Sequence, residues 1–278
     1  MSRIWFITGT SRGFGRIWAE AALGRGDKVA ATARNIATLA DLVDRYGDRV
    51  LPIPLDVIDR PAVELAVKTA HDHCGRLDVV VNNAGYGLFG MTEEVTEQQA
   101  RDQFETNVFG VLWVTQAVLP YLREQGSGHV IQVSSIGGLH AFPGLGIYNA
   151  SKWALEAMSQ ALAAEVAGFG VKVTIVEPAG YATDWGGSSA VRSDPMSAYE
   201  PVREAVAAFW RDTTPGDPLV TAPALLDVVD AEEPPLRIFH GAGLLSMMRI
   251  EYAQRIAVWE DWTHISQAAM GNPSATVG

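Results

Sequence analysis

A tyrosine and a lysine one helical turn apart are the residues whose types and spacing first suggest chemistry. The stretch GIYNASKWALEAM places Tyr148 four residues before Lys152, at the start of a predicted helix. Side chains at i and i+4 lie on one helical face, where a cation favours a phenolate and lowers the tyrosine pKa. A tyrosine tuned in this way could serve as general acid and base. The same pair could instead only cover a surface, so its surroundings must separate the two interpretations.

A serine precedes this pair at the end of a predicted strand. Ser135 follows the strand HVIQVS, and open α/β sheets bind ligands at the carboxyl ends of such strands. Reduction of a carbonyl by hydride leaves an alkoxide that needs a proton, which Tyr148 could supply. The Ser135 hydroxyl could donate to the same oxygen and stabilise its charge. Ser134 competes for this role, but it is interpreted as the last residue of the strand.

The elements that must position these residues follow a regular alternation. Short runs rich in Val and Ile alternate with longer segments of helical period, which predicts an α/β fold with a parallel sheet buried on both faces. The predicted strands are Arg3–Thr8, Lys28–Ala33, Val50–Leu55, Leu77–Asn83, His129–Ser134, Lys172–Pro178 and Leu236–His240. The predicted helices span 14–24, 35–46, 60–74, 96–122, 148–168, 201–211, 221–230 and 243–268.

The alternation changes after Pro178. Residues 179–215 are rich in small and turn-forming types but keep several aromatic ones, which favours a substrate lid over a solvated linker. Residues 241–270 form a predicted C-terminal helical extension, and the tail GNPSATVG is expected to fray. Because no repeat and no linker is evident, residues 1–278 are interpreted as one domain.

The composition of the chain limits the kinds of ligand and partner that are expected. The 278 residues carry a net charge of −11, which argues against nucleic acid as a ligand. No apolar run approaches the ~20 residues that span a bilayer, so no membrane insertion is expected. The start of the chain lacks the features of a signal peptide, and the single cysteine, Cys74, suits a reducing compartment, so a cytoplasmic location is expected.

A glycine-rich loop follows the first predicted strand. In TGTSRGFG, Gly9, Gly13 and Gly15 precede a helix, whose unpaired N–H groups and positive dipole end suit a pyrophosphate. Glycines also make ordinary turns, but the strand–loop–helix placement strengthens the nucleotide interpretation. The spacing is G-x-x-x-G-x-G rather than the usual dinucleotide G-x-G-x-x-G.

Together with NNAG (Asn82–Gly85) and Tyr148-x-x-x-Lys152, this loop resembles the motifs of the short-chain dehydrogenase/reductase family over about residues 3–184. The resemblance implies a single-domain, Rossmann-type doubly wound sheet of about seven parallel strands with helices on both faces. It implies a homodimer or homotetramer that interconverts carbonyls and alcohols. It also implies a catalytic set in which Asn107 holds a water that relays protons to the lysine: Asn107, Ser135, Tyr148 and Lys152.

The cofactor is expected to be NADP(H). Ala33 stands where an acidic residue would bind the ribose of NAD, while Arg34 and the loop residue Arg12 could hold a 2′-phosphate. Asp56 is expected at the adenine, with a helix cap as its alternative role. The full set of implied cofactor contacts is Gly9, Ser11, Arg12, Gly13, Phe14, Gly15, Arg34, Asp56, Val57, Asn82, Ala84, Gly85, Tyr148, Lys152, Pro178, Gly180 and Thr183.

The substrate is expected to be small and hydrophobic. The residues next to the catalytic groups are mainly apolar and aromatic, which suits a bulky ketone, aldehyde or secondary alcohol. The segment around Tyr148 is similar to the branch of the family that contains steroid and retinol dehydrogenases. The candidate contacts are Tyr86, His140, Phe142, Leu145, Tyr181, Trp185 and Met196.

Other interpretations remain open at this stage. The fold could serve a non-catalytic NADP(H) sensor, although such a protein could lose the serine, tyrosine or lysine, and all three are present. An NAD(H)-using alcohol dehydrogenase is a further alternative. A sugar epimerase of the related extended family would be longer and usually has a different glycine loop. A metal site is not expected, because in HDHC (71–74) His71 and His73 point apart on a helix.

Overall fold

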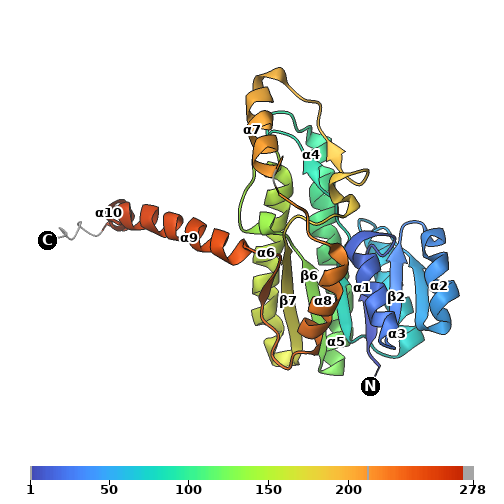
Figure 1. Cartoon of the computed structure of the whole chain (residues 1–278). Helices are drawn as coiled ribbons and strands as arrows, with labels where there is room; N and C mark the ends of the chain where they lie inside the picture. Colours follow the sequence, from blue (N-terminus) through green and yellow to red (C-terminus); the bar gives the residue numbers. More distant parts are fainter. Residues whose placement is uncertain (1, 212, 272–278) are drawn as a thin grey trace. The chain divides into compact units, whose positions relative to one another are not determined.

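The computed structural model describes residues 2–211 and 213–271. A parallel sheet of seven strands, in the order β3-β2-β1-β4-β6-β7-β9, organises the chain up to His240 (Figure 1). This confirms the predicted doubly wound α/β fold. The strands are β1 (Ile4–Ile7), β2 (Lys28–Ala33), β3 (Val50–Pro54), β4 (Val79–Asn82), β6 (Gly128–Val133), β7 (Val171–Pro178) and β9 (Arg237–His240).

The order of the strands places a switch point beside β1. This strand pairs in parallel with β2 on one side and with β4 on the other. The chain therefore first builds outward to β3 and then returns to build the opposite half of the sheet. Side chains alternate across the sheet, so Phe6 packs into one apolar layer, and Trp5 and Ile7 into the other.

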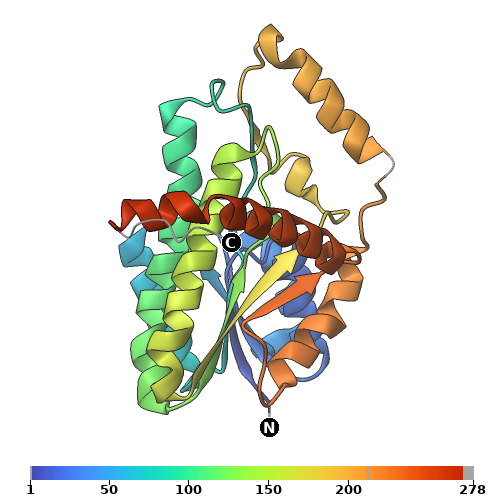
Figure 2. The same cartoon turned by 90° about the vertical axis from the view of Figure 1, so that its left-hand side faces the viewer.

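Helices cover both faces (Figure 2). One face packs against α3 (Arg60–Cys74), α5 (Val111–Gln125) and α6 (Gly146–Val166). The other packs against α1 (Gly13–Gly24), α2 (Ala40–Tyr46) and α8 (Thr221–Asp230). Helix α4 (Glu97–Phe104) runs into α5 through a π-helical turn, Glu105–Gly110. Gly75 and Gly126 end α3 and α5 in the left-handed conformation that glycine permits.

The segment that follows β7 packs on the loop that follows β4. Here β8 (Val191–Arg192) pairs in parallel with β5 (Leu88–Phe89), and the Ser193 hydroxyl donates to Gln99 at 2.9 Å. Helix α7 (Glu200–Arg211) is tied to the same region by an ion pair of 2.6 Å between Arg203 and Glu94. Residues Ala179–Arg211 are called the lid below.

Residues from Gly241 onward form a second compact unit. Its described helices are α9 (Leu244–Asp261) and α10 (Thr263–Ala269), and Gly243, whose φ is +80°, directly precedes α9. None of the described helices combines the length and the apolar character needed to cross a bilayer. Gly271 ends the described chain, so the predicted frayed tail after it, 272–278, lies outside the described residues.

Candidate active site

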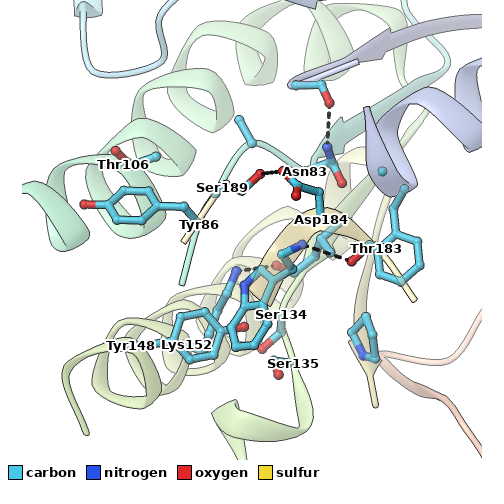
Figure 3. A pocket seen from close by; sticks show the side chains of 18 of the residues that line it. Asn83, Tyr86, Thr106, Ser134, Ser135, Tyr148, Lys152, Thr183, Asp184 and Ser189 are labelled. Atoms are coloured by element: carbon cyan, nitrogen blue, oxygen red, sulfur yellow. Dashed lines mark hydrogen bonds between the residues drawn. The ribbon is translucent and has the colours of Figure 1, made fainter. Parts of the chain in front are cut away.

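A cleft of about 640 Å³ opens at the carboxyl edge of the sheet (Figure 3). All seven strands are parallel, so the loops that follow them converge on this edge. The cleft brings together most of the predicted site residues: Gly9, Ser11, Arg12, Gly13, Phe14, Arg34, Asp56, Val57, Ala84, Gly85, Tyr86, Ser135, Phe142, Leu145, Tyr148, Lys152, Pro178, Gly180, Tyr181, Thr183 and Trp185.

The glycine loop is held by the loop that follows β4. The Asn83 amide donates to the backbone oxygens of Thr8 at 2.9 Å and Gly9 at 3.0 Å. Gly9 and Gly13 adopt φ of +71° and +62°, which is strained for other residues. No side chain caps the start of α1. Its first N–H groups are therefore available to a bound anion.

Tyr148, Lys152 and Ser135 meet at the floor of the cleft, as predicted from their spacing (Figure 3). Tyr148 and Lys152 are 5% and 7% exposed, so both side chains are enclosed by protein. The Lys152 ammonium donates to the backbone oxygen of Val133 at 2.8 Å and lies 5.9 Å from the centre of the Tyr148 ring. The end of β6 and helix α6 thus form one wall of the cleft, which carries all three groups. Residues Ser134–Lys152 are called the catalytic wall below.

The predicted lowering of the tyrosine pKa is wrong for this arrangement. Burial raises the pKa of Tyr148 to about 12, and a hydrogen bond from Ser135 opposes that rise only in part. Burial also lowers the pKa of Lys152 to about 8, against the pull of Glu156. Burial has the largest influence on the Tyr148 pKa, and the Lys152 ammonium donates instead to the Val133 carbonyl. Tyr148 is accordingly a protonated acid at neutral pH.

Asn107 does not line the cleft, although it was predicted in the catalytic set. It lies in the π-helical turn, where its amide donates to the Tyr86 oxygen at 3.1 Å and to Ser151 at 3.2 Å. Its own oxygen accepts from the Tyr86 N–H at 3.2 Å. Both donors of the amide are thus occupied, and Asn107 fastens the loop after Gly85 to α6. Its side chain positions this loop and does not reach the cleft.

Four further predicted residues also lie outside the lining. A Cβ at Gly15 would overlap the Asn83 amide, so this glycine serves close packing. Asn82 is buried and donates to Thr115 at 3.2 Å. His140 packs against Phe142, with ring centres 4.7 Å apart. The Met196 N–H donates to Glu94 at 2.7 Å, and its side chain is exposed.

A buried acidic pair lies behind the catalytic wall. Glu156, one helical turn after Lys152, and Glu177 on β7 both approach the Arg237 guanidinium, at 2.9 and 3.5 Å. Burial and then the neighbouring Glu156 raise the pKa of Glu177 to about 8. Burial also raises the pKa of Glu156, against the effects of Ser134 and Arg237. At neutral pH, therefore, Glu177 is mainly protonated beside Arg237 and Glu156.

The two predicted phosphate-binding arginines both line the cleft, and Arg34 follows β2 with its side chain exposed. Arg12 forms an ion pair of 2.8 Å with Asp184, a lid residue that the sequence did not suggest. Asp56 also lines the cleft, whereas the cap of α3 is Asp59, which accepts from the Ala62 N–H at 3.0 Å. The alternative role of Asp56 as this helix cap is therefore wrong.

The apolar part of the cleft is centred on Trp185. Its ring lies 5.0 Å from the rings of both Tyr148 and Phe89, and it packs on Gly87. Trp210 on α7 also lines the cleft and lies 5.5 Å from Phe142. The sequence missed Trp210, because it approaches from a helix distant along the chain. Other lining residues that the prediction missed include Asn83, Asp102, Thr106, Asn149, Asp184, Ser189 and Val191.

The fold is a doubly wound parallel sheet of the type that binds dinucleotides. The edge of this sheet where ligands bind carries an acidic phenol, an ammonium cation and a serine hydroxyl. The family model described as short chain dehydrogenase matches residues 3–192. The chain is 43% identical over 278 residues to "Oxidoreductase BOA17" of Botryotinia fuckeliana, across 97% of this chain and all of that protein. The chain therefore belongs to the short-chain dehydrogenase family and is an oxidoreductase.

Other similarities extend this result. A 3-ketodihydrosphingosine reductase of Bacteroides thetaiotaomicron is 40% identical over 181 residues, or 65% of each protein. A short-chain dehydrogenase from Streptomyces avermitilis has a TM-score of 0.90 and 40% identity, covering 96% of this chain and 98% of its own. An alcohol dehydrogenase of Thermococcus sibiricus, solved with 5-hydroxy-NADP, has a TM-score of 0.74 and 26% identity, covering 88% and 98%.

Proposed function

We propose that this oxidoreductase uses NADP(H) to interconvert a ketone or aldehyde and an alcohol on a bulky hydrophobic substrate, with Tyr148 as the general acid and base. The observation that carries the proposal is the enclosed group of Tyr148, Ser135 and Lys152 at the floor of the cleft. A buried, protonated phenol bonded to a second hydroxyl suits proton transfer to an oxygen.

The residues of the cleft fit NADP(H). The glycine loop and the uncapped start of α1 suit the pyrophosphate, and Arg12 and Arg34 suit a 2′-phosphate. Ala33 offers no carboxylate to repel that phosphate. The Thermococcus alcohol dehydrogenase with 5-hydroxy-NADP supports the same choice. Asp56 would meet the adenine, Thr183 the carboxamide and Lys152 the nicotinamide ribose.

When bound, the cofactor would supply hydride to a carbonyl or accept it from an alcohol. The chain's own groups handle the charge and the proton. Ser135 donates a hydrogen bond to the substrate oxygen and stabilises its developing negative charge. Tyr148, with a pKa of about 12, holds its proton until the oxygen becomes basic, which favours its use as the acid in reduction. Lys152, with a pKa of about 8, can gain or lose a proton near neutral pH and help to restore it.

The substrate class follows from the apolar end of the cleft. Phe142, Leu145, Tyr181, Trp185 and Trp210 offer large surfaces and no formal charge. A substrate buried against them gains by leaving water in proportion to its apolar area. The relative named 3-ketodihydrosphingosine reductase is consistent with a keto group as the reacting function.

The test measures the decay of NADPH absorbance with a panel of hydrophobic ketones and aldehydes. Tyr148→Phe should lower kcat by at least about 10³-fold, since it removes the proton donor, and should leave NADPH affinity within about twofold. Tyr121→Phe is the matched control, because Tyr121 stacks on His71 outside the cleft. Substantial turnover by Tyr148→Phe would remove Tyr148 from the acid role. Tight NADPH binding without turnover of any carbonyl would favour a sensor.

A further inference from the structure

The lining of the cleft includes an ion pair between the glycine loop and the lid. Arg12, the residue before α1, approaches Asp184 with its Nη1 atom 2.8 Å from Oδ2. Asp184 begins the short 3₁₀ turn Asp184–Gly186, directly after Thr183. Both residues line the cleft, and their side chains are 54% and 36% exposed. The pair is thus accessible to a ligand that enters this end of the cleft.

The carboxylate of Asp184 is held as an anion by its own segment (Figure 3). Its Oδ1 accepts from the Ser188 N–H at 3.0 Å, and its Oδ2 accepts from the Ser188 and Ser189 hydroxyls at 2.8 and 2.7 Å. These bonds, with the two serine side chains first, hold the pKa of Asp184 at about 2. The Asp184 carboxylate is a compact anion that binds hydroxyls, a backbone amide and the Arg12 guanidinium. It therefore pairs with Arg12 in the way that a phosphate would.

We propose that Asp184 competes with the 2′-phosphate of NADP(H) for Arg12, and so acts as a residue that sets cofactor specificity and connects cofactor binding to the lid. The inference rests on the proposed function, in which Arg12 receives that phosphate. A cofactor with the phosphate has to displace the carboxylate or share the arginine with it. A cofactor without the phosphate leaves the pair intact. Asp184 therefore weakens NADP(H) selectively and moderates the preference over NAD(H).

The position of Asp184 connects the binding of the cofactor to the attachment of the lid. The carboxylate holds Ser188 and Ser189 on one side and Arg12 on the other, so it ties residues 184–189 to the glycine loop. Displacement by phosphate would free this end of the lid, while the other end keeps the Arg203–Glu94 pair. Cofactors with and without the phosphate would thus leave the lid with different attachments.

The test compares 2′,5′-ADP with 5′-AMP, two probes that differ only by the 2′-phosphate, in calorimetric titrations of the full-length protein. Asp184→Asn should lower the Kd for 2′,5′-ADP about two- to fivefold, the range for a partly exposed ion pair, and leave that for 5′-AMP unchanged. Asp194→Asn, which removes an equal charge at an exposed lid position, should change neither. In an Arg12→Ser background the effect of Asp184→Asn should disappear.

Three outcomes would overturn the inference. An unchanged or higher Kd of Asp184→Asn for 2′,5′-ADP would mean that the carboxylate does not compete, or that it orients Arg12 productively. An equal gain in the Arg12→Ser background, or with Asp194→Asn, would assign the effect to the net charge of −11. If the wild-type protein binds 2′,5′-ADP no more tightly than 5′-AMP, the NADP(H) assignment fails and the inference fails with it. The first two outcomes leave that assignment standing.

Discussion

The catalytic wall and the lid face each other across the same cleft, but they are held in different ways. In the wall, Tyr148 and Lys152 are almost fully buried, and Lys152 bonds to the backbone of the central sheet. The lid is fastened by the short β5–β8 pairing and by charged and polar contacts. Arg12–Asp184 and Tyr199–Glu93 lie near the surface, whereas the Glu94 side chain that holds Arg203 is only 3% exposed. Exposed ion pairs contribute at most about 1 kcal/mol each, whereas an unpaired buried charge costs several.

This difference assigns separate tasks to the two regions. The wall can keep the reacting groups in one geometry, because any displacement exposes or orphans a buried polar group. The exposed contacts of the lid, such as Arg12–Asp184, can be exchanged at little cost, which suits the selection of cofactor and substrate. Substitutions in the wall should therefore lower kcat, while substitutions in the lid should change KM or binding constants.

After Tyr148→Phe, the largest effect is expected for Ser135, one of two neighbouring serines of the wall. Ser135→Ala should lower kcat about 10²–10³-fold, because it removes the hydroxyl that bonds to Tyr148 and would stabilise the substrate oxygen. Ser134→Ala should lower kcat less than about tenfold, since the Ser134 hydroxyl stabilises the ionised form of Glu156 and does not act on Tyr148. Steady-state kinetics with one ketone from the panel measure both. Equal losses in the two variants would contradict the assignment of Ser135.

The wall was also the region that the sequence predicted best. Tyr148, Lys152 and Ser135 sit on one strand–loop–helix unit, so local spacing sufficed to bring them together. Asn82 was predicted at the cleft, yet Asn83 lies there, because Asn82 ends β4 and donates to the buried Thr115, whereas Asn83 belongs to the loop that follows. The wrong prediction for the Tyr148 pKa has a related origin, since spacing indicates a charged neighbour but not the depth of burial.

The lid was predicted only as a region. Aromatic residues after Pro178 indicated contact with a ligand, but they did not show which of them reach the cleft. Trp210 and Met196 are about equally exposed, at 40% and 39%, but only Trp210, on α7, lines the cleft and lies beside Phe142. Arg12 and Asp184 are far apart along the chain, because most strands of the sheet lie between them in the sequence. No local sequence pattern therefore indicates that they form a pair.

A lid tryptophan should give the opposite kinetic response to the wall serines. Trp185→Leu should raise KM for bulky ketones about tenfold, equivalent to about 1.4 kcal/mol, and leave kcat within about threefold. The reason is lost apolar contact at the centre of the substrate end. Trp262→Leu, in α9–α10, is the matched control because that side chain is exposed and does not line the cleft. A fall in kcat equal to the rise in KM would show that Trp185 acts on Tyr148 itself.

The smallest effect should come from the acidic pair behind the wall, and it appears in stability rather than in rate. The folded-state pKa of Glu177 is about 8, above its ordinary value of 4.5, so the folded protein binds an extra proton between these values. Its contribution to stability therefore decreases as pH rises from about 4.5 to 8.

The Glu177→Gln variant keeps the shape of the side chain but cannot titrate, and in it Arg237 still pairs with Glu156. Between pH 5 and 8 its Tm should fall at least about 2 °C less than that of the wild type, in calorimetric scans at both pH values. Glu165→Gln, at an exposed position of the same helix as Glu156, should follow the wild type. Parallel Tm curves for the wild type and Glu177→Gln would mean that this buried carboxyl keeps an ordinary pKa and adds no pH dependence to the stability.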